Sequence, residues 1–311
     1  MGYLITALKG FCMGASDIVP GVSGGTIALI FGIYERFVAN VYAGAKVLFS
    51  VAKFDFANAI AGFKKIEWGF IIPLGVGLLT AVVLLSGVIE SQLENNPEEI
   101  AGLFFGLVVA SIVVGVSLLQ HDKQTNAVLA VIALAAGAFF FWGLGFVSEP
   151  VADPSLWFFL GSGAIAVCAM ILPGISGSFI LLMLGMYIAV LDALHDRDFL
   201  ALGVFIIGMT IGLALFSSVL QRALKAQHDL ILAVLIGLMI GSLRVLWPWP
   251  NGVGIISDVA EENVSGTGLE WPSEGLLIPT LLAVIAFVVV VGISTFANGK
   301  TDGEVVETSQ T

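Results

Sequence analysis

Two short segments of the sequence combine hydroxyl side chains with glycine and proline, a combination that suits the binding of an anion. They are Val19–Thr26, which ends in Pro-Gly-Val-Ser-Gly-Gly-Thr, and Leu172–Ser178, which reads Leu-Pro-Gly-Ile-Ser-Gly-Ser. Glycine lets the backbone approach a ligand closely, hydroxyls donate hydrogen bonds, and the unpaired amides at a helix N-terminus attract negative charge. We therefore predict that these segments bind a phosphate or carboxylate group through Ser23, Gly24, Gly25, Thr26, Ser176, Gly177 and Ser178. The alternative is that the small residues only allow two hairpins to cross tightly in the membrane.

Two acidic residues near the first segment are candidates for ion coupling. Asp17 is the only ionisable residue between Lys9 and Glu35, inside an apolar stretch. An acid within a membrane is costly and suggests a proton or sodium site. The alternative for Asp17 is a helix cap, in which the carboxylate accepts a hydrogen bond from a backbone amide. Glu35 follows the first apolar stretch and is the second candidate for ion coupling.

Three arginines are candidates for binding the phosphate of a lipid. Arg36 follows the first apolar stretch, Arg197 lies in a polar connector, and Arg244 lies near the end of an apolar stretch beside Trp247. Arginine pairs well with phosphate oxygens. An arginine at the end of a membrane segment also serves as an interfacial anchor, and for Arg36 we favour the anchor slightly.

Catalytic motifs are missing from the sequence. Cys12 and Cys168 lie in apolar stretches, and His121, His195 and His228 lie in separate short polar connectors. A metal cluster is therefore not expected, and no histidine lies in a membrane segment to activate a serine nucleophile. We predict a protein that is not an enzyme and that needs neither a metal nor another cofactor, apart from H⁺ or Na⁺ as a coupling ion.

Composition places the chain in a membrane. Of its 311 residues, 58% are hydrophobic and 11% are charged, whereas soluble domains carry roughly 25% charged residues. The net charge of −11 argues against a nucleic-acid partner, which requires a basic surface.

Six stretches are long and apolar enough to cross a bilayer, because a spanning helix needs about 20 apolar residues. They are Trp68–Ile89, Ile100–Gln120, Ala127–Val147, Phe199–Leu220, Leu230–Trp247 and Leu276–Ala297. Residues 1–36 and 154–191 are also apolar, but a Pro-Gly motif interrupts each of them. We predict that each forms a re-entrant hairpin of two half-helices, with the motif at its tip.

The two hairpins belong to an internal repeat. At a shift of 153 residues, eight of the 15 pairs between Pro20–Tyr34 and Pro173–Tyr187 are identical, including Pro20/Pro173, Ser23/Ser176 and Tyr34/Tyr187. Farther along, the best shift is 131, with matches such as Gly77/Gly208 and Gly106/Gly237. The difference places about 22 extra residues within Glu35–Lys65, which we expect to form an interfacial helix.

An all-α inverted repeat follows from this organisation. Residues 1–147 form the first repeat: hairpin 1–36, interfacial stretch 37–66 and three spans. Residues 154–297 form the second repeat: hairpin 154–191 and three spans. Residues 298–311 form a tail. An odd number of spans turns the second repeat upside down relative to the first, as in many secondary transporters.

The basic residues predict the orientation of the chain. With both termini in the cytoplasm, nine of the 12 lysines and arginines fall on the cytoplasmic side, while Arg197 alone falls in the outer connectors. Lys9 lies within the apolar run instead of before it, so we expect no cleavable signal peptide. The predicted location is the cytoplasmic membrane, with several crossings.

Both motifs resemble those of the PopT family of polyprenyl-phosphate transporters. The resemblance rests on Ser16–Thr26 with Gly32-x-Tyr34-Glu35, and on Ile171–Phe179 with Gly185-Met186-Tyr187, and it extends over roughly Leu4 to Ala297. It implies a translocase that returns undecaprenyl phosphate, or a related polyprenyl phosphate, from the outer to the inner leaflet. The implied partners are that lipid and the bilayer, and the oligomeric state stays open.

Two other functions are compatible with the residues alone. The same hairpin tips would serve a secondary transporter of a small soluble anion. A membrane enzyme acting on a lipid phosphate is disfavoured, because neither a base nor a metal site is evident.

Overall fold

The computed structural model describes residues 2–19, 22–119, 123–143, 150–249, 272 and 275–308, and every regular element within them is an α-helix. Thirteen helices occupy these ranges: α1 Gly2–Asp17, α2 Gly24–Ile30, α3 Tyr34–Ala52, α4 Phe56–Phe63, α5 Trp68–Asn95, α6 Pro97–Ser117, α7 Lys123–Gly143, α8 Leu156–Ile171, α9 Gly177–Met183, α10 Tyr187–His195, α11 Phe199–Ala226, α12 His228–Ser242 and α13 Leu277–Thr308. Predicted features at Pro20, Gly21, residues 120–122, 144–149 and most of the 248–274 loop lie outside the described residues.

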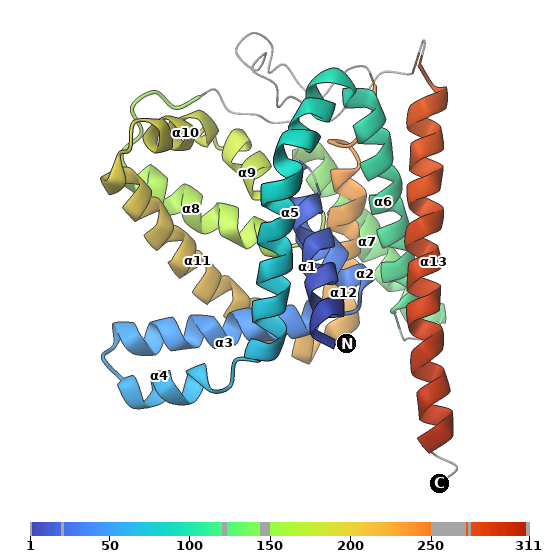
Figure 1. The fold of residues 1–311 in the computed structure, drawn as a ribbon, viewed down its shortest axis with the longest axis horizontal. Helices are drawn as coiled ribbons and strands as arrows, with labels where there is room; N and C mark the ends of the chain where they lie inside the picture. The colour runs from blue at the N-terminus through green and yellow to red at the C-terminus, as the bar shows by residue number, and fades with distance from the viewer. Residues whose placement is uncertain are drawn as a thin grey trace.

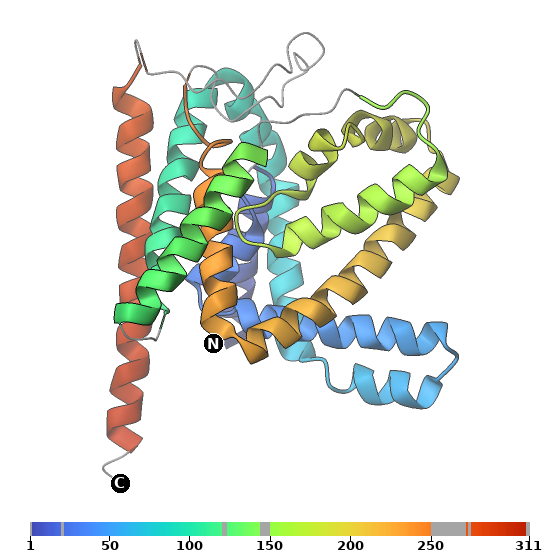
Figure 2. The ribbon, with the colours of Figure 1, turned by 180° about the vertical axis from the view of Figure 1, so that it is seen from behind.

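Two opposite views show the arrangement of the helices. α6 and α13 run side by side at one edge, while α8 and α11 lie together at the other (Figures 1 and 2). α3 and α4 lie below α8 and α11 in this view, and α3 packs against α11 (Figure 1). α1 and α2 lie at the centre, where α2 contacts α6 and α8.

Four of the six predicted spans are long and apolar enough to cross a membrane. Among the described residues they are Trp68–Leu93, Pro97–Ser117, Phe199–Ala226 and Leu277–Thr295. The other two predicted spans form shorter apolar helices, over Ala127–Gly143 and His228–Ser242. The prediction for 230–247 ran past the helix because apolar residues continue beyond Ser242, where the chain leaves the helix in a series of turns. At the other end of the chain, α13 continues to Thr308, so the predicted tail is helical over most of its length.

Each predicted hairpin consists of a 16-residue helix followed by a 7-residue helix. A helix of seven residues rises only about 10 Å, too little to cross a bilayer. The same turn ends both short helices. After α2, Gly32 has φ +64° and the Ile33 amide donates to the Ala28 carbonyl at 2.9 Å. After α9, Gly185 has φ +68° and Met186 donates to Leu181 at 2.9 Å, so every position in this turn is shifted by 153 residues.

Glycines bring the backbones of paired helices into contact. A Cβ atom on Gly77 of α5 would overlap the carbonyl oxygen of Ala7 in α1, and one on Gly208 of α11 would overlap that of Leu160 in α8. These contacts correspond to one another under the shifts of 131 and 153 residues. Small residues at such crossings let helices pack closely in lipid.

Four of the other helices pair between the two halves of the sequence. Gly106 of α6 lies against the Ala283 carbonyl of α13, and its sequence equivalent, Gly237 of α12, lies against the Ala133 carbonyl of α7. α6 therefore pairs with α13, and α12 pairs with α7. The helices of the two halves are therefore interleaved, and the two hairpins meet where α2 contacts α8.

Two helices, α3 and α4, occupy most of the stretch that was expected to be a single interfacial helix. Several apolar side chains around the turn between them are exposed, including Phe49, Phe54 and Phe56. Lys46 and Lys53 lie over the rings of Tyr42 and Phe49, at 4.8 and 4.3 Å from the ring centroids. Exposed aromatic rings bordered by lysines are typical of helices that lie at a membrane surface.

Candidate functional site: the facing hairpin tips

Asp17 and Ser23 cap the first short helix. The Gly24 amide donates to Asp17 Oδ1 at 2.6 Å, and the Gly25 amide donates to Ser23 Oγ at 3.1 Å. Ser23 has the extended backbone of an N-cap residue, with φ −129° and ψ 141°. The sequence therefore folds here as a capped helix start, in which two of the free amides are satisfied by side chains. The hydrogen bond that Asp17 makes in this structure is that of a helix cap, the alternative to an ion site.

Glycine at position 24 makes room for the Asp17 carboxylate. A Cβ atom on Gly24 would lie 2.6 Å from Asp17 Oδ2. The equivalent contact in the second hairpin joins Gly177 to Met170, where a Cβ atom would lie 2.6 Å from Met170 Cγ. The two contacts occupy equivalent positions and differ in chemistry, since a carboxylate in the first is replaced by a thioether in the second.

The second tip has its hydroxyls paired with each other. Ser176 Oγ and Ser178 Oγ lie 2.7 Å apart, and Ser176 makes no side-chain cap to α9. Gly174 has φ +81°, a conformation open to glycine, and a Cβ atom there would lie 2.8 Å from Met239 Cα in α12. The second tip is therefore held against α12 at a position where only glycine fits.

Three side chains of the first hairpin region bind the backbone of the second tip. Ser23 Oγ donates to the Met170 carbonyl at 3.1 Å, and Tyr34 Oη donates to the Ile171 carbonyl at 3.2 Å. The Gly174 amide donates to Thr26 Oγ1 at 2.9 Å. Gly25 lies so close that a Cβ atom there would be 2.8 Å from the Ile171 carbonyl oxygen.

The two predicted segments thus meet in one buried site. Thr26 is fully buried, Ser23 is 1% exposed and Ser176 is 7% exposed. The small residues let the two segments approach each other closely, which is compatible with either of the two predicted roles. The hydroxyls of Ser23 and Thr26 each hydrogen-bond the backbone of the second hairpin, so polar groups from both hairpins lie close together there.

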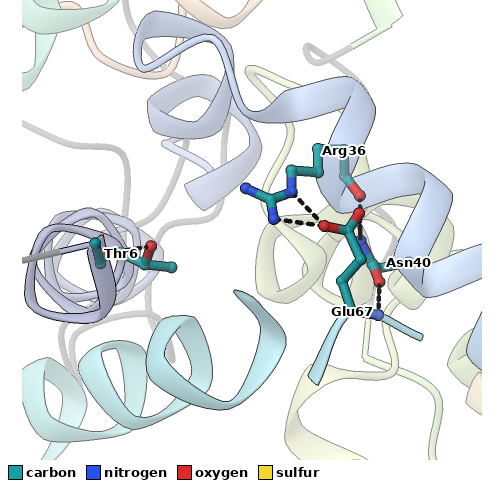
Figure 3. A network of polar contacts seen from close by, with 5 residues as sticks. Thr6, Arg36, Asn40 and Glu67 are labelled. Atoms are coloured by element: carbon teal, nitrogen blue, oxygen red, sulfur yellow. Dashed lines mark hydrogen bonds and ion pairs between the residues drawn. The ribbon is translucent and has the colours of Figure 1, made fainter. Parts of the chain in front are cut away.

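Arg36 and Glu35 lie just beyond the tip region, at the start of α3. Arg36 Nε donates to Glu67 Oε2 at 2.9 Å, and the guanidinium lies 4.2 Å from the Phe70 ring centroid. Asn40 holds the same glutamate, since its Nδ2 donates to Glu67 Oε1 at 3.2 Å (Figure 3). The hydrogen bonds from Arg36 and Asn40 lower the pKa of Glu67. Arg36 is therefore held at the junction between α3 and α5.

Glu35 pairs with a histidine that the sequence analysis did not single out for any role. His228 Nε2 lies 2.8 Å from Glu35 Oε1, and His228 Nδ1 lies 2.7 Å from Asp229 Oδ1. Both ring nitrogens face carboxylates, an arrangement that suits the protonated imidazolium, which donates from both. The hydrogen bond to Asp229, together with Glu35, raises the pKa of His228. This pair connects α3 to α12.

The other two arginines lie in connectors away from the tips. Arg197 is exposed, with φ +56°, in the turn between α10 and α11. Arg244 follows α12 and donates from Nη1 to the Phe141 carbonyl at 2.8 Å. This hydrogen bond joins the end of α12 to α7, whereas the glycines and hydroxyls of the two tips contact one another.

Comparison with known proteins assigns the family. Residues 13–264 match the model of a family described as undecaprenyl phosphate translocase-like. The chain belongs to this family. It is 38% identical over 310 residues to a polyprenyl-phosphate transporter of Vibrio cholerae, an alignment covering 96% of this chain and 98% of the relative. It is 31% identical over 262 residues to a polyprenyl-phosphate transporter of Staphylococcus aureus, covering 78% and 86% of the two chains. No solved structure matches the chain.

Membership in the undecaprenyl phosphate translocase-like family agrees with the resemblance noted from the two motifs. Together with the four long apolar helices, it identifies a multi-pass membrane protein whose curated relatives are named as transporters. The family match covers both hairpin tips, from the middle of α1 to beyond α12.

Proposed function

We propose that this protein carries undecaprenyl phosphate, or a related polyprenyl phosphate, from the outer to the inner leaflet of the cytoplasmic membrane. Two relatives that align over most of the chain are named polyprenyl-phosphate transporters, which supports the substrate class. The observation that carries the site assignment is the meeting of the two tips, in which Ser23 and Thr26 hydrogen-bond the backbone on either side of Pro173.

The inverted repeat is part of the proposal. Its support lies in contacts that recur at the sequence shifts, such as Gly77 on Ala7 and Gly208 on Leu160. Two related halves of opposite orientation, with broken helices near the midplane, make a site that can open to either side by rocking of one half against the other.

Phosphate would replace contacts that the tips now make with each other. A phosphate that leaves water needs hydrogen bonds in exchange, because burying it without them costs many kcal/mol. Donors for this purpose are the hydroxyls of Ser23, Thr26, Ser176 and Ser178, with the amides of Gly24, Gly25 and Gly177. When the hairpins separate, Ser23 and Thr26 lose their partners in the second hairpin and become available to the phosphate. The Gly24 and Gly25 amides, and the paired Ser176 and Ser178 hydroxyls, would have to exchange a partner within their own hairpin for the phosphate. The prenyl chain stays in lipid beside the helices.

Asp17 supplies a reason for ion coupling. Its carboxylate holds the Gly24 amide at 2.6 Å, at the end of α2 that also suits a phosphate. Two anions at one helix end repel each other, so a phosphate binds better once Asp17 is protonated or neutralised by sodium. Uptake of H⁺ or Na⁺ would thus accompany phosphate binding. Glu35 is the second candidate for this coupling, through its pair with His228.

Arg36, Arg197 and Arg244 are proposed to guide the phosphate at the two surfaces. Arg197 is exposed in an outer connector and suits the first encounter with the lipid. Arg36 would bind the phosphate at the cytoplasmic surface once the phosphate displaces Glu67 from the Arg36 guanidinium.

A leaflet-resolved assay tests the proposal. Purified protein is reconstituted into vesicles with labelled undecaprenyl phosphate, and the fraction accessible from outside is followed over time. The parent protein is expected to move the label between leaflets, while Ser23→Ala and Asp17→Asn move it at least tenfold more slowly. Chemically altered lipid after incubation would indicate an enzyme instead. Saturable uptake of a soluble anion that undecaprenyl phosphate does not inhibit would also contradict the proposal.

A further inference from the structure

Among the described residues, every side chain that hydrogen-bonds across the two hairpins belongs to the first hairpin region. Side chains of the first hairpin region, Ser23, Thr26 and Tyr34, bind backbone atoms of the second tip. In the described residues, no hydrogen bond runs from a side chain of the second hairpin to the backbone of the first. The contact between the two related elements is therefore asymmetric.

The second hairpin carries two of the same groups at equivalent positions. Ser176 corresponds to Ser23, and Tyr187 corresponds to Tyr34, at the shift of 153 residues. Ser176 is paired with Ser178, and the partly exposed Tyr187 hydroxyl makes no hydrogen bond among the described residues. The second hairpin therefore has hydroxyls that could hydrogen-bond the backbone of the first, but they do not form such contacts with the residues that the structure describes.

We propose that the state open to the opposite side exchanges these contacts. In that state Ser176 Oγ donates to the carbonyl of Asp17, and Tyr187 Oη donates to the carbonyl of Ile18, the positions equivalent to Met170 and Ile171. This inference rests on the proposed function, because it requires two access states related by the repeat. In inverted-repeat transporters one repeat moves against the other around the site, and an exchange of equivalent contacts between the two halves gives such a movement two related end states.

Some contacts of the present state have no counterpart in the exchanged state. The position equivalent to Thr26 is Phe179, which offers no hydroxyl. The pair between Glu35 and His228 also has no equivalent, because Ile188 and Pro97 occupy the matching positions. The present state is therefore favoured over the exchanged one, and loss of the Thr26 hydroxyl reduces that preference.

Matched tyrosine variants test the exchange without measuring transport. Cys12 and Cys168 are replaced by alanine, and spin labels are attached at Ser91→Cys and His195→Cys, exposed positions on the two halves. Distances between the labels then report the populations of the two states in vesicles. One hydroxyl hydrogen bond is worth roughly 0.5–1.5 kcal/mol, which corresponds to a change of about two- to tenfold in the population ratio.

The two single variants are expected to act in opposite directions. Tyr34→Phe lowers the population of the present state, Tyr187→Phe raises it, and the double variant returns toward the parent. Ser23→Ala and Ser176→Ala provide a second matched pair, and Thr26→Val lowers the present state. Shifts in the same direction for both tyrosine variants, or one unchanging distance in all of them, would overturn the exchange.

The two proposals can fail separately. Opposite shifts in a protein that does not move undecaprenyl phosphate would support the exchange and contradict the proposed function. Normal lipid transport without opposite shifts would support the function and contradict the exchange.

Discussion

The Tyr34 hydroxyl donates a hydrogen bond to the carbonyl oxygen of Ile171 at 3.2 Å, across 137 positions of sequence. Tyr34 is 3% exposed and begins α3, directly after the turn that ends the first short helix. The acceptor lies at the last residue of α8, where the helix leaves carbonyl groups without partners. A side chain from the first half thus satisfies the broken helix end of the second half.

Because the two hairpins approach closely at Gly25, we predict that Gly25→Ala lowers both stability and transport. The added methyl group would lie 2.8 Å from the Ile171 carbonyl oxygen, and overpacking of this kind costs about 1–3 kcal/mol. We expect a lower melting temperature in detergent and slower lipid transport.

Gly75→Ala is the matched control for this substitution. Gly75 lies within α5, and a Cβ atom there has no neighbour within 4 Å. Because alanine favours a helix more than glycine does, stability should stay the same or rise by up to about 1 kcal/mol. Equal effects of the two substitutions would show that the contact between the hairpins is not tight.

Neutralising Asp17 is predicted to separate its two roles. Asp17→Asn keeps an oxygen that accepts from the Gly24 amide but removes the charge, while Asp17→Ala removes both. We expect Asp17→Asn to fold with a loss of about 1 kcal/mol or less, and Asp17→Ala to lose about 1–2 kcal/mol because the cap is gone. In vesicles, transport by Asp17→Asn should no longer respond to a pH or sodium gradient. A gradient response equal to that of the parent would assign Asp17 to capping alone.

Variants of the pair between Arg36 and Glu67 show whether Arg36 serves as an interfacial anchor or as a ligand for the phosphate. Both side chains are about half exposed, so a double-mutant cycle should give a coupling of only about 0.2–1 kcal/mol. If Arg36 also receives the phosphate, Arg36→Gln slows transport severalfold, whereas Glu67→Gln, which frees the guanidinium, does not. Equal loss of transport in both variants would indicate that the pair acts only by holding α3 against α5.

Because His228 lies between Glu35 and Asp229, we predict that the stability of the protein depends on pH. Its neighbours raise the pKa of His228 above the ordinary 6.5. The folded state therefore holds this proton more tightly than the unfolded state does. The resulting stabilisation is complete below about pH 6.5 and is lost as the pH rises through the raised pKa.

Melting temperatures measured between pH 5.5 and 9 check this dependence. The parent should lose more stability across that range than His228→Gln, which cannot take up the proton. Glu35→Gln should show a smaller pH dependence than the parent, because one of the two carboxylates that raise the pKa is gone. Parallel curves for all three proteins would contradict the assignment.

Hydropathy and repetition predicted much of the helical arrangement. The apolar runs located the four long helices, because a bilayer demands a minimum length of apolar helix. The Pro-Gly motifs fall between α1 and α2 and between α8 and α9, where the helices are interrupted. The equal turns after α2 and α9 follow from Gly32 and Gly185, which the repeat placed in register. Where a helix such as α12 stops within an apolar run, hydropathy carries no signal for its end.

The partners of the site residues were harder to predict. The acceptors for Ser23 and Tyr34 are backbone carbonyls, which every residue has, so no residue type marks them. Glu67 and His228 are separated from Arg36 and Glu35 by long stretches of chain, and only the folded arrangement of α3 against α5 and α12 brings them together. For Asp17 the sequence allowed both a cap and an ion site, because both roles require the same carboxylate.

The most direct measurement is the rate at which labelled undecaprenyl phosphate crosses between leaflets of vesicles that contain the protein. We expect rapid exchange with the parent, exchange at least tenfold slower with Ser23→Ala or Asp17→Asn, and normal exchange with Gly75→Ala. Exchange at the parent rate in the Ser23 and Asp17 variants, all folded and present in equal amounts, would contradict the assignment of transport to the facing hairpin tips.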